Sequence, residues 1–280
     1  MKTIRLGIST CPNDTFAFHA LLTGQVHPSG VELEIELMDI EELNERMSNG
    51  QLDAAKVSYA AAVDMAADIW VLPSGSALGY GVGPLLLAAR PDTQPQSPEQ
   101  LALCPGRWTT AALLFQLFYP QTARVEHVVF SQIMPRLKAR HADFGVCIHE
   151  GRFTWQEQGL HLVEDLGQRW ETETGQPLPL GGLVVRRRVG REAASALQQA
   201  VRASLEYAKN DPQLALPTMR RYAQEFADHV LMQHVDLYVN RWTYDLGDEG
   251  RAAIACLSRY AARHSPHGPA ELTVLPTTAD

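Results

Sequence analysis

Two stretches of the sequence, ERMSNGQLDAAKVSY (45–59) and PRLKARHADFGVCIHE (135–150), share one pattern. In each, residues at helical spacing lead through a short turn with an aspartate into an apolar run typical of a buried strand. Polar groups then follow the run, Ser58 in the first stretch and His149 in the second. Open α/β sheets bind ligands beyond the carboxyl ends of their strands. Two such units that face each other across a cleft would place Ser58 and His149 on opposite walls.

The flanking sequence continues this alternation of strands and helices. Residues 3–9 read as a buried strand, and residues 31–38 alternate apolar and glutamate side chains as a half-exposed strand does. Between them, Asn13 or Asp14 can cap a helix that stops at Gly24. Further helices are predicted over 41–48, 109–119 and 132–140, and further strands over 54–57, 125–130 and 144–148. The pattern predicts an α/β architecture.

The domain organisation follows from two Gly- and Pro-punctuated segments, 73–90 and 177–187, which suit paired crossover strands at a hinge. One lobe is therefore expected to contain 1–83 and 184–280, and the other 84–183. Residues 192–263 are expected to be helical and to complete the first lobe. Residues 265–280, rich in Pro and Thr, are expected to form a surface tail.

Composition excludes several classes of protein. The 280 residues are 45% hydrophobic and carry 32 acidic against 24 basic side chains, a formal net charge of -8. A nucleic-acid partner is disfavoured, because phosphate binding needs a basic face. No window approaches the roughly 18 uninterrupted apolar residues of a membrane-spanning helix, and the N-terminus lacks the pattern of a secretory signal. The scattered cysteines (Cys11, Cys104, Cys147 and Cys256) suggest buried thiols in a reducing compartment. We therefore expect a soluble cytoplasmic protein.

The sequence lacks the short motifs that hold common cofactors. It has no G-x-G-x-x-G after the first strand, no phosphate-binding G-x-x-x-x-G-K-[ST], no H-E-x-x-H and no G-x-S-x-G. The acidic residues of YVNRWTYDLGDEG (238–250) do not follow the spacing of a calcium loop. We therefore expect neither a metal nor an organic cofactor.

Two loops could carry polar groups into the cleft. In STCPNDTF (9–16), Asn13, Asp14 and Thr15 follow the first strand and either cap the next helix or form a polar wall. In PGRWTTAALL (105–114), a loop with a glycine opens an apolar helix whose first amides lie at the positive end of the helix dipole. The Thr110 side chain and the Ala111 amide are candidate anion ligands, although a simple threonine cap would explain the same pattern.

The segment HEGRFTW (149–155) has the highest density of functional side chains. His149 follows an apolar run where a strand would emerge into the cleft, and a neutral imidazole there can act as a general base near pH 7. Glu150 could set its tautomer, and Arg152 could bind an anion. A purely structural histidine remains the alternative.

Taken together, the motifs resemble one family. They are CPNDTF (11–16), K-x-SYAA (56–61), ALGYGVGPL (77–85), PGR-x-TTA (105–111), IHEGRFT (148–154) and LPLGGL (178–183). Their number and order resemble the 1,4-dihydroxy-6-naphthoate synthase family of the futalosine route of menaquinone biosynthesis. The resemblance covers about residues 3–255. Trp108, before the two threonines, occupies a position that need not be fixed in the family.

The resemblance implies a fold like that of type II periplasmic binding proteins, with two α/β lobes, a two-stranded hinge and a ligand cleft between them. It implies a cytoplasmic lyase that converts cyclic dehypoxanthine futalosine to 1,4-dihydroxy-6-naphthoate and releases dihydroxyacetone. The substrate is a carboxylated aromatic compound with a ring derived from a sugar. The family's base falls on His149, and its substrate contacts fall on Lys56, Val57, Ser58, Thr110 and Ala111. Asn13, Asp14, Thr15 and Arg152 are possible additional cleft residues.

Two other functions remain open. A solute-binding protein for a small aromatic carboxylate would have the same fold, and so would the related enzyme chorismate dehydratase. The base-like His149 weighs against a receptor, and the motifs CPNDTF and IHE differ from those usual for the dehydratase. The sequence leaves the oligomeric state open.

Overall fold

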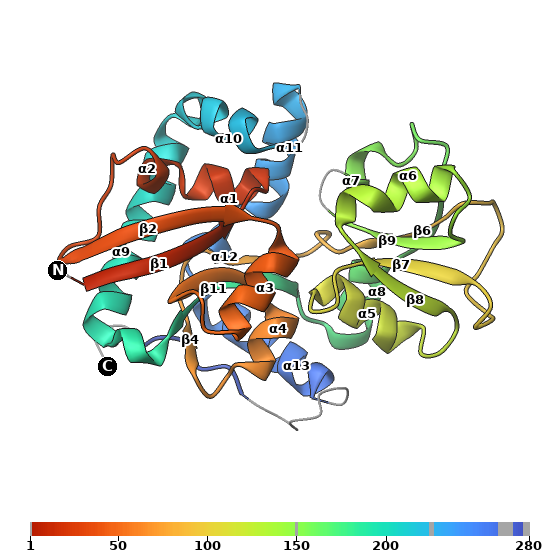
Figure 1. The fold of residues 1–280 in the computed structure, drawn as a ribbon, viewed down its shortest axis with the longest axis horizontal. Coiled ribbons are helices and arrows are strands. Elements are labelled where there is room, and N and C mark those ends of the chain that lie inside the picture. Colours follow the sequence, from red (N-terminus) through yellow and green to blue (C-terminus); the bar gives the residue numbers. More distant parts are fainter. Residues whose placement is uncertain (1, 149–150, 224–226, 263–270, 277–280) are drawn as a thin grey trace.

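The computed structural model describes residues 2–148, 151–223, 227–262 and 271–276, which form two β-sheets that lie side by side, each flanked by helices (Figure 1). The first sheet has six strands, five of them in the order β2-β1-β3-β11-β4, and β5 pairs with β11. β1 is parallel to β2 and β3, whereas β11 is antiparallel to its neighbours. The strand bounds are β1 (Lys2–Ser9), β2 (Val31–Met38), β3 (Ala54–Ser58), β4 (Ile69–Val71), β5 (Ala77–Gly79) and β11 (Leu178–Arg186).

The second sheet has five strands in the order β10-β6-β9-β7-β8. β7 is parallel to β8 and β9, and β6 is antiparallel to β9 and β10. The bounds are β6 (Leu85–Ala88), β7 (Leu101–Pro105), β8 (Arg124–Val128), β9 (Phe144–Cys147) and β10 (His161–Asp165). Both sheets are mixed, so the predicted α/β class is confirmed.

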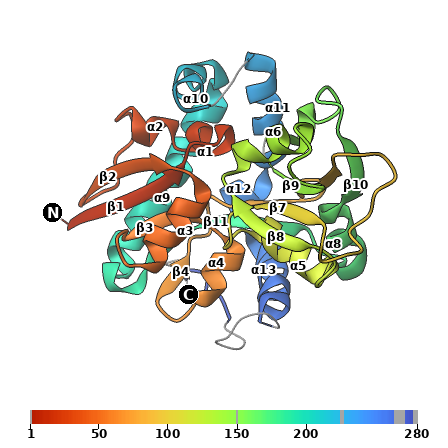
Figure 2. The same ribbon diagram turned by 45° about the vertical axis from the view of Figure 1, so that its right-hand side comes forward.

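The helices surround these sheets in both views (Figures 1 and 2). Their bounds are α1 (Pro12–Ala17), α2 (His19–Leu22), α3 (Ile40–Ser48), α4 (Tyr59–Asp64), α5 (Thr110–Phe118), α6 (Ile133–Lys138), α7 (Gly151–Thr154), α8 (Leu166–Thr174), α9 (Arg191–Asn210), α10 (Leu216–Tyr222), α11 (Asp228–Tyr238), α12 (Arg241–Tyr244) and α13 (Gly247–Ala261). Short 3₁₀ turns occupy Phe130–Gln132, Arg187–Val189 and Pro212–Leu214. Within the described part of the chain, no helix is long and apolar enough to cross a membrane.

Helices from the C-terminal part of the chain cover the two faces of the first sheet. Leu197 and Val201 of α9 share one apolar cluster with Leu6 of β1. Leu257 of α13 belongs to the cluster that contains Val57 of β3. Because successive strand residues point to opposite faces, β3, β4 and β11 contribute to both clusters. Burial of each such leucine or valine is worth about 1.5–3 kcal/mol, which fixes the sheet between its helices.

The chain crosses from the first sheet to the second after β5 and returns by α8 and β11. At the crossing, Gly83 faces Gly167 so closely that a Cβ on Gly83 would lie 2.2 Å from the Gly167 Cα. Only glycine fits such a close backbone approach. The antiparallel pairing of β5 with β11 matches the paired crossover strands expected at 73–90 and 177–187. We propose, as before, that one lobe contains 1–83 and 184–280 and that the other contains 84–183. Strand β11 runs through the boundary between residues 183 and 184.

The predicted surface tail at 265–280 is wrong where the structure describes it. The Leu275 amide donates to the Val71 carbonyl, the Val71 amide donates to the Thr273 carbonyl, and Leu272 and Leu275 are buried. β4 is an edge strand with unpaired backbone groups, which the C-terminal segment satisfies. This pairing uses backbone atoms and needs no periodic side-chain pattern, so no pattern in the sequence indicated it. Residues 265–270 and 277–280 lie outside the described residues.

Candidate active site

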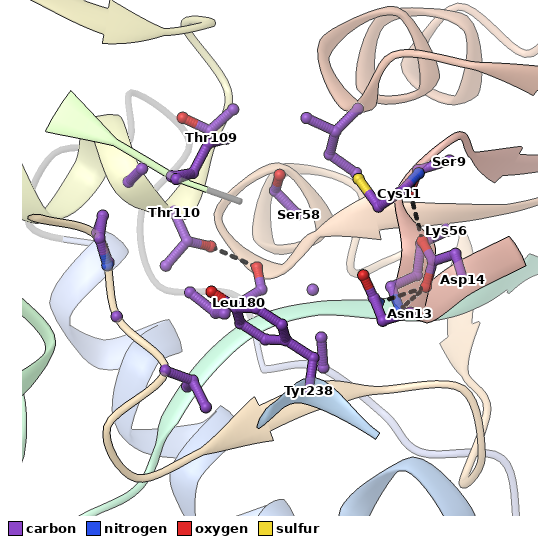
Figure 3. Close-up of a pocket in the computed structure, with 18 of the residues that line it drawn as sticks. Ser9, Cys11, Asn13, Asp14, Lys56, Ser58, Thr109, Thr110, Leu180 and Tyr238 are labelled. Atoms are coloured by element: carbon purple, nitrogen blue, oxygen red, sulfur yellow. Dashed lines mark hydrogen bonds and ion pairs between the residues drawn. The ribbon is translucent and has the colours of Figure 1, made fainter. Parts of the chain in front are cut away.

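A pocket lies where the two sheets meet, and strand ends and helix starts from both sheets line it (Figure 3). It holds about 670 Å³ of space free of atoms, part of it open to solvent. The lining residues are Ser9, Cys11, Asn13, Asp14, Ile40, Lys56, Ser58, Ala77, Val82, Gly83, Pro84, Thr109, Thr110, Ala111, Ile148, Leu180, Gly181, His234 and Tyr238. In Figure 3, Ser9, Asn13, Asp14 and Lys56 lie on one side, and Thr109 and Thr110 lie on the other.

The first wall is built around a buried ion pair. The Lys56 Nζ lies 2.8 Å from the Asp14 Oδ1, and the two side chains are only 5% and 4% exposed. Lys56 also donates to the Gly75 carbonyl, and Asp14 accepts from the Ser9 hydroxyl and from the Asn13 side-chain amide. Charges this deeply buried need such partners, because burial costs each ion on the order of several kcal/mol in hydration free energy.

The helix-capping interpretation of Asn13 and Asp14 is wrong. The N-cap of α1 is Cys11, which makes no side-chain cap hydrogen bond, and Pro12 is the first helical residue. Asn13 and Asp14 turn into the pocket wall, as the alternative interpretation expected. Thr15 is buried, and its hydroxyl donates to the Cys11 carbonyl at 3.1 Å. Thr15 does not belong to the lining of the pocket.

Helix α11 supplies lining residues that sequence reasoning missed. The His234 Nε2 lies 3.0 Å from the Asn13 Oδ1. Because the Asn13 amide nitrogen donates to Asp14, its oxygen is the acceptor, and we assign the proton of this bond to Nε2 of His234. The ring of Tyr238 lies 4.5 Å from that of His234. Their spacing of four residues, which places both on one helix face, was the available signal.

Ser58 ends β3 and faces the pocket, as its place after the strand predicts. Its amide donates to the Asn44 Oδ1 at 2.9 Å, and the Asn44 Nδ2 donates to the Ser58 Oγ at 3.2 Å. The hydroxyl is thus held as an acceptor from Asn44 and can still direct its own proton to a ligand. Val57, between Lys56 and Ser58, packs into the core and does not belong to the lining.

The opposite wall is the start of α5. Thr109 is the N-cap, and its Oγ1 accepts from the Ala112 amide at 3.1 Å. The Thr110 hydroxyl donates to the Leu180 carbonyl of β11 at 2.7 Å, so its single proton is already used. The amides of Thr110 and Ala111 have no partner within the helix because they belong to its first turn. These amides, together with the helix dipole, form a suitable site for a carboxylate.

The segment predicted to carry the base is described only in part. His149 and Glu150 lie outside the described residues. Ile148, which precedes them, lines the pocket. Arg152 lies in α7 and pairs with Asp165 at 2.7 Å while also donating to the Gly83 carbonyl. Arg152 does not belong to the lining of the pocket. Its guanidinium group instead binds Asp165 and the Gly83 carbonyl, near the point where the chain crosses between the sheets.

Two cysteine thiols differ in their surroundings. Burial raises the pKa of the Cys104 thiol to about 12, which keeps it protonated near neutral pH. Cys11 lines the pocket. Among the described residues, no group of three or more His, Cys, Asp or Glu side chains is arranged to hold a metal ion.

A family model described as menaquinone biosynthesis matches residues 4–263. Over 258 residues the chain is 45% identical to the 1,4-dihydroxy-6-naphthoate synthase of Thermus thermophilus, which covers 92% of this chain and 93% of the relative. It is 41% identical over 265 residues to the synthase of the same name from Streptomyces coelicolor, covering 93% of each.

Solved structures extend the likeness to the fold. Protein AF1704 of Archaeoglobus fulgidus superposes with a TM-score of 0.87 at 28% identity, over 94% of this chain and 97% of that one. The periplasmic aliphatic sulphonate binding protein of Escherichia coli superposes with a TM-score of 0.68 at 11% identity, over 100% of this chain and 94% of that one. The predicted fold of the periplasmic binding protein type is thereby confirmed.

Proposed function

This chain belongs to the menaquinone-biosynthesis family, and from that premise we propose that it acts as a 1,4-dihydroxy-6-naphthoate synthase. Its substrate in this proposal is cyclic dehypoxanthine futalosine, and its products are 1,4-dihydroxy-6-naphthoate and dihydroxyacetone. The observation that carries the proposal is the pocket itself, in which the start of α5 lies opposite a buried polar wall, with apolar side chains in the rest of the lining. The proposal includes a cytoplasmic location, because the curated relatives are named as biosynthetic enzymes.

The pocket suggests how the substrate lies. Its carboxylate would bind the amides of Thr110 and Ala111, where unpaired N–H groups and the helix dipole favour an anion. The flat aromatic part suits the apolar lining, which includes Ile40, Val82 and Leu180. Hydroxyl groups of the sugar-derived ring would meet the polar wall, where Ser58 can donate a proton. Lys56 then contributes chiefly by holding Asp14, because two of its three donors bind Asp14 and the Gly75 carbonyl.

His149 is the proposed general base. It removes a proton from a sugar-derived hydroxyl or an adjacent carbon, and the released electron pair drives cleavage of a C–C bond as in a retro-aldol reaction. Aromatisation of the new ring draws the reaction forward. The family motif IHE and the position of Ile148 in the pocket lining support this assignment. A substrate bound between the two sheets would be partly shielded from water, which would protect the electron-rich intermediate.

Incubation of the purified protein with cyclic dehypoxanthine futalosine, followed by mass spectrometry, tests the proposed function. The naphthoate and dihydroxyacetone should accumulate in equal amounts. A parallel incubation with chorismate should leave chorismate unchanged. Tight binding without product would instead identify a solute-binding protein, and loss of water from chorismate would identify the dehydratase.

A further inference from the structure

A single carboxylate joins helix α3, which packs on the first sheet, to the loop between β7 and α5. Glu41 lies in the first turn of α3, where its amide donates to the N-cap Asp39 at 2.9 Å. Its side chain reaches across to the loop and accepts from the amides of Arg107 and Trp108. Both Glu41 oxygens lie 3.1 Å from the Trp108 nitrogen. The carboxylate therefore binds backbone that belongs to the other side of the pocket.

The loop backbone fits against Glu41 so tightly that position 106 has no room for a side chain. Gly106 has a φ of 83°, and a Cβ there would lie 2.5 Å from the Glu41 Oε2 and 2.9 Å from its Cβ. On its other side the loop is held by the second sheet, because the Gly106 amide donates to the Val128 carbonyl at 3.1 Å. The loop is thus held from both sheets, and Glu41 is the group that holds it from the first.

This contact is continuous with the pocket. Ile40, beside Glu41, and Thr109, beside Trp108, both line it. The Asn44 Nδ2 lies 3.4 Å from the Glu41 Oε2 and 3.2 Å from the Ser58 Oγ. Any shift of the loop relative to Glu41 would move the amides of α5 that directly follow Trp108.

The contact with the loop removes part of the hydration of the Glu41 carboxylate. Burial raises the pKa of its carboxyl, an effect larger than the opposing hydrogen bonds from Trp108 and Arg107. Its neighbour Glu42 is exposed and lies 3.9 Å from Arg46. Glu42 therefore offers a matched control on the same helix.

We propose that Glu41 is a positioning residue, which fastens the loop 106–108 across the pocket and so sets the α5 amides for the carboxylate of the substrate. The role in substrate binding rests on the proposed function, whereas the fastening of the loop does not. Glu41 itself need not touch the substrate, since it acts through the loop backbone.

Three variants test the proposal by steady-state kinetics. Glu41→Ala removes two hydrogen bonds to a charged acceptor, so we expect KM to rise about tenfold or more, with a smaller change in kcat. Glu41→Gln should recover much of the loss, because one oxygen, Oε1, accepts from both amides and a glutamine carbonyl can take its place. Glu42→Ala should match the wild type. A KM for Glu41→Ala within twofold of the wild type, or no recovery in Glu41→Gln, would overturn the proposal.

Hydrogen exchange of residues 106–112 separates this proposal from the proposed function, because it needs no substrate. The amides of Arg107 and Trp108 should exchange faster in Glu41→Ala than in the wild type and Glu42→Ala. Equal exchange in all three proteins would refute the fastening of the loop even in an active enzyme. Faster exchange in a protein without synthase activity would support the fastening and remove only the proposed substrate.

Discussion

The Lys56 ammonium group and the Asp14 carboxylate form an ion pair of 2.8 Å, buried in the wall of the pocket. The pair joins β3 to α1, and its members have Ser9, Asn13 and the Gly75 carbonyl as further partners. This arrangement uses two of the three Lys56 donors and makes Lys56 a support for the polar wall.

Lys56→Met should therefore destabilise the protein strongly, since it leaves the Asp14 charge buried without its cation. We expect a loss of about 3–5 kcal/mol in the free energy of unfolding, measured by urea titration. Adding Asp14→Asn should recover part of that loss, because it removes the buried charge that Lys56→Met leaves without a cation. The exposed pair Arg202–Glu206 provides the control, and Arg202→Ala should cost less than about 1 kcal/mol. Equal losses of stability in Lys56→Met and Arg202→Ala would contradict a buried ion pair between Lys56 and Asp14.

Thr110→Val should weaken substrate binding more than turnover. The change removes the hydrogen bond from the Thr110 hydroxyl to the Leu180 carbonyl, which fixes the start of α5. The first amides of α5, which are proposed to bind the carboxylate, are then held less firmly. We expect KM to rise several-fold, by the loss of about one hydrogen bond, with kcat near the wild-type value. Thr109→Ala removes the cap instead and should lower stability by about 0.5–2 kcal/mol. A Thr110→Val effect confined to kcat would count against an anion-anchoring role for this helix start.

His234→Ala should disturb the wall opposite α5. It leaves the Asn13 side-chain oxygen without its donor, which costs about 1–3 kcal/mol for a buried group, and it enlarges the pocket. We expect lower stability in thermal unfolding and a higher KM. His229, exposed on the same helix, gives the control variant His229→Ala, which should leave both quantities unchanged. Similar behaviour of the two variants would exclude His234 from the site.

Acid should destabilise the fold through His19. Burial lowers the pKa of this imidazole from its usual 6.5, so the native state binds its proton less readily than the unfolded chain. The stabilisation is present above the unfolded pKa and is lost as pH falls from about 7 towards the lowered native value. The Tm of the wild type should decline between pH 7 and 5 more steeply than that of His19→Gln. Parallel pH profiles of the two proteins would contradict this assignment.

Much of the fold could be predicted because local patterns determine it. The glutamates of β2 are exposed, whereas Val31 is buried and Leu33, Ile35 and Leu37 are partly buried on the other face, as the alternation requires for a half-exposed strand. The position of Ser58 at the pocket follows from its place at a strand end. The C-terminal segment beside β4 could not be predicted, because its pairing depends on backbone groups of a distant strand.

The site was harder to predict because its partners are far apart in the sequence. Asp14 lies 42 residues from Lys56, and Asn13 lies 221 residues from His234. An aspartate at a helix start has the same sequence pattern whether it caps the helix or pairs with a buried lysine. Likewise, nothing near Glu41 indicates that its carboxylate reaches the loop at 106–108. The contacts of Glu41 with this loop exist only once both sheets have formed.

The most direct test of the proposed mechanism is a single-turnover measurement on His149→Ala with cyclic dehypoxanthine futalosine, beside calorimetric measurement of substrate binding. Loss of a general base should lower the rate of naphthoate formation by about 10²–10⁴-fold while the Kd stays within a few-fold of the wild type. Product formation at the wild-type rate would contradict the role of His149 as the base.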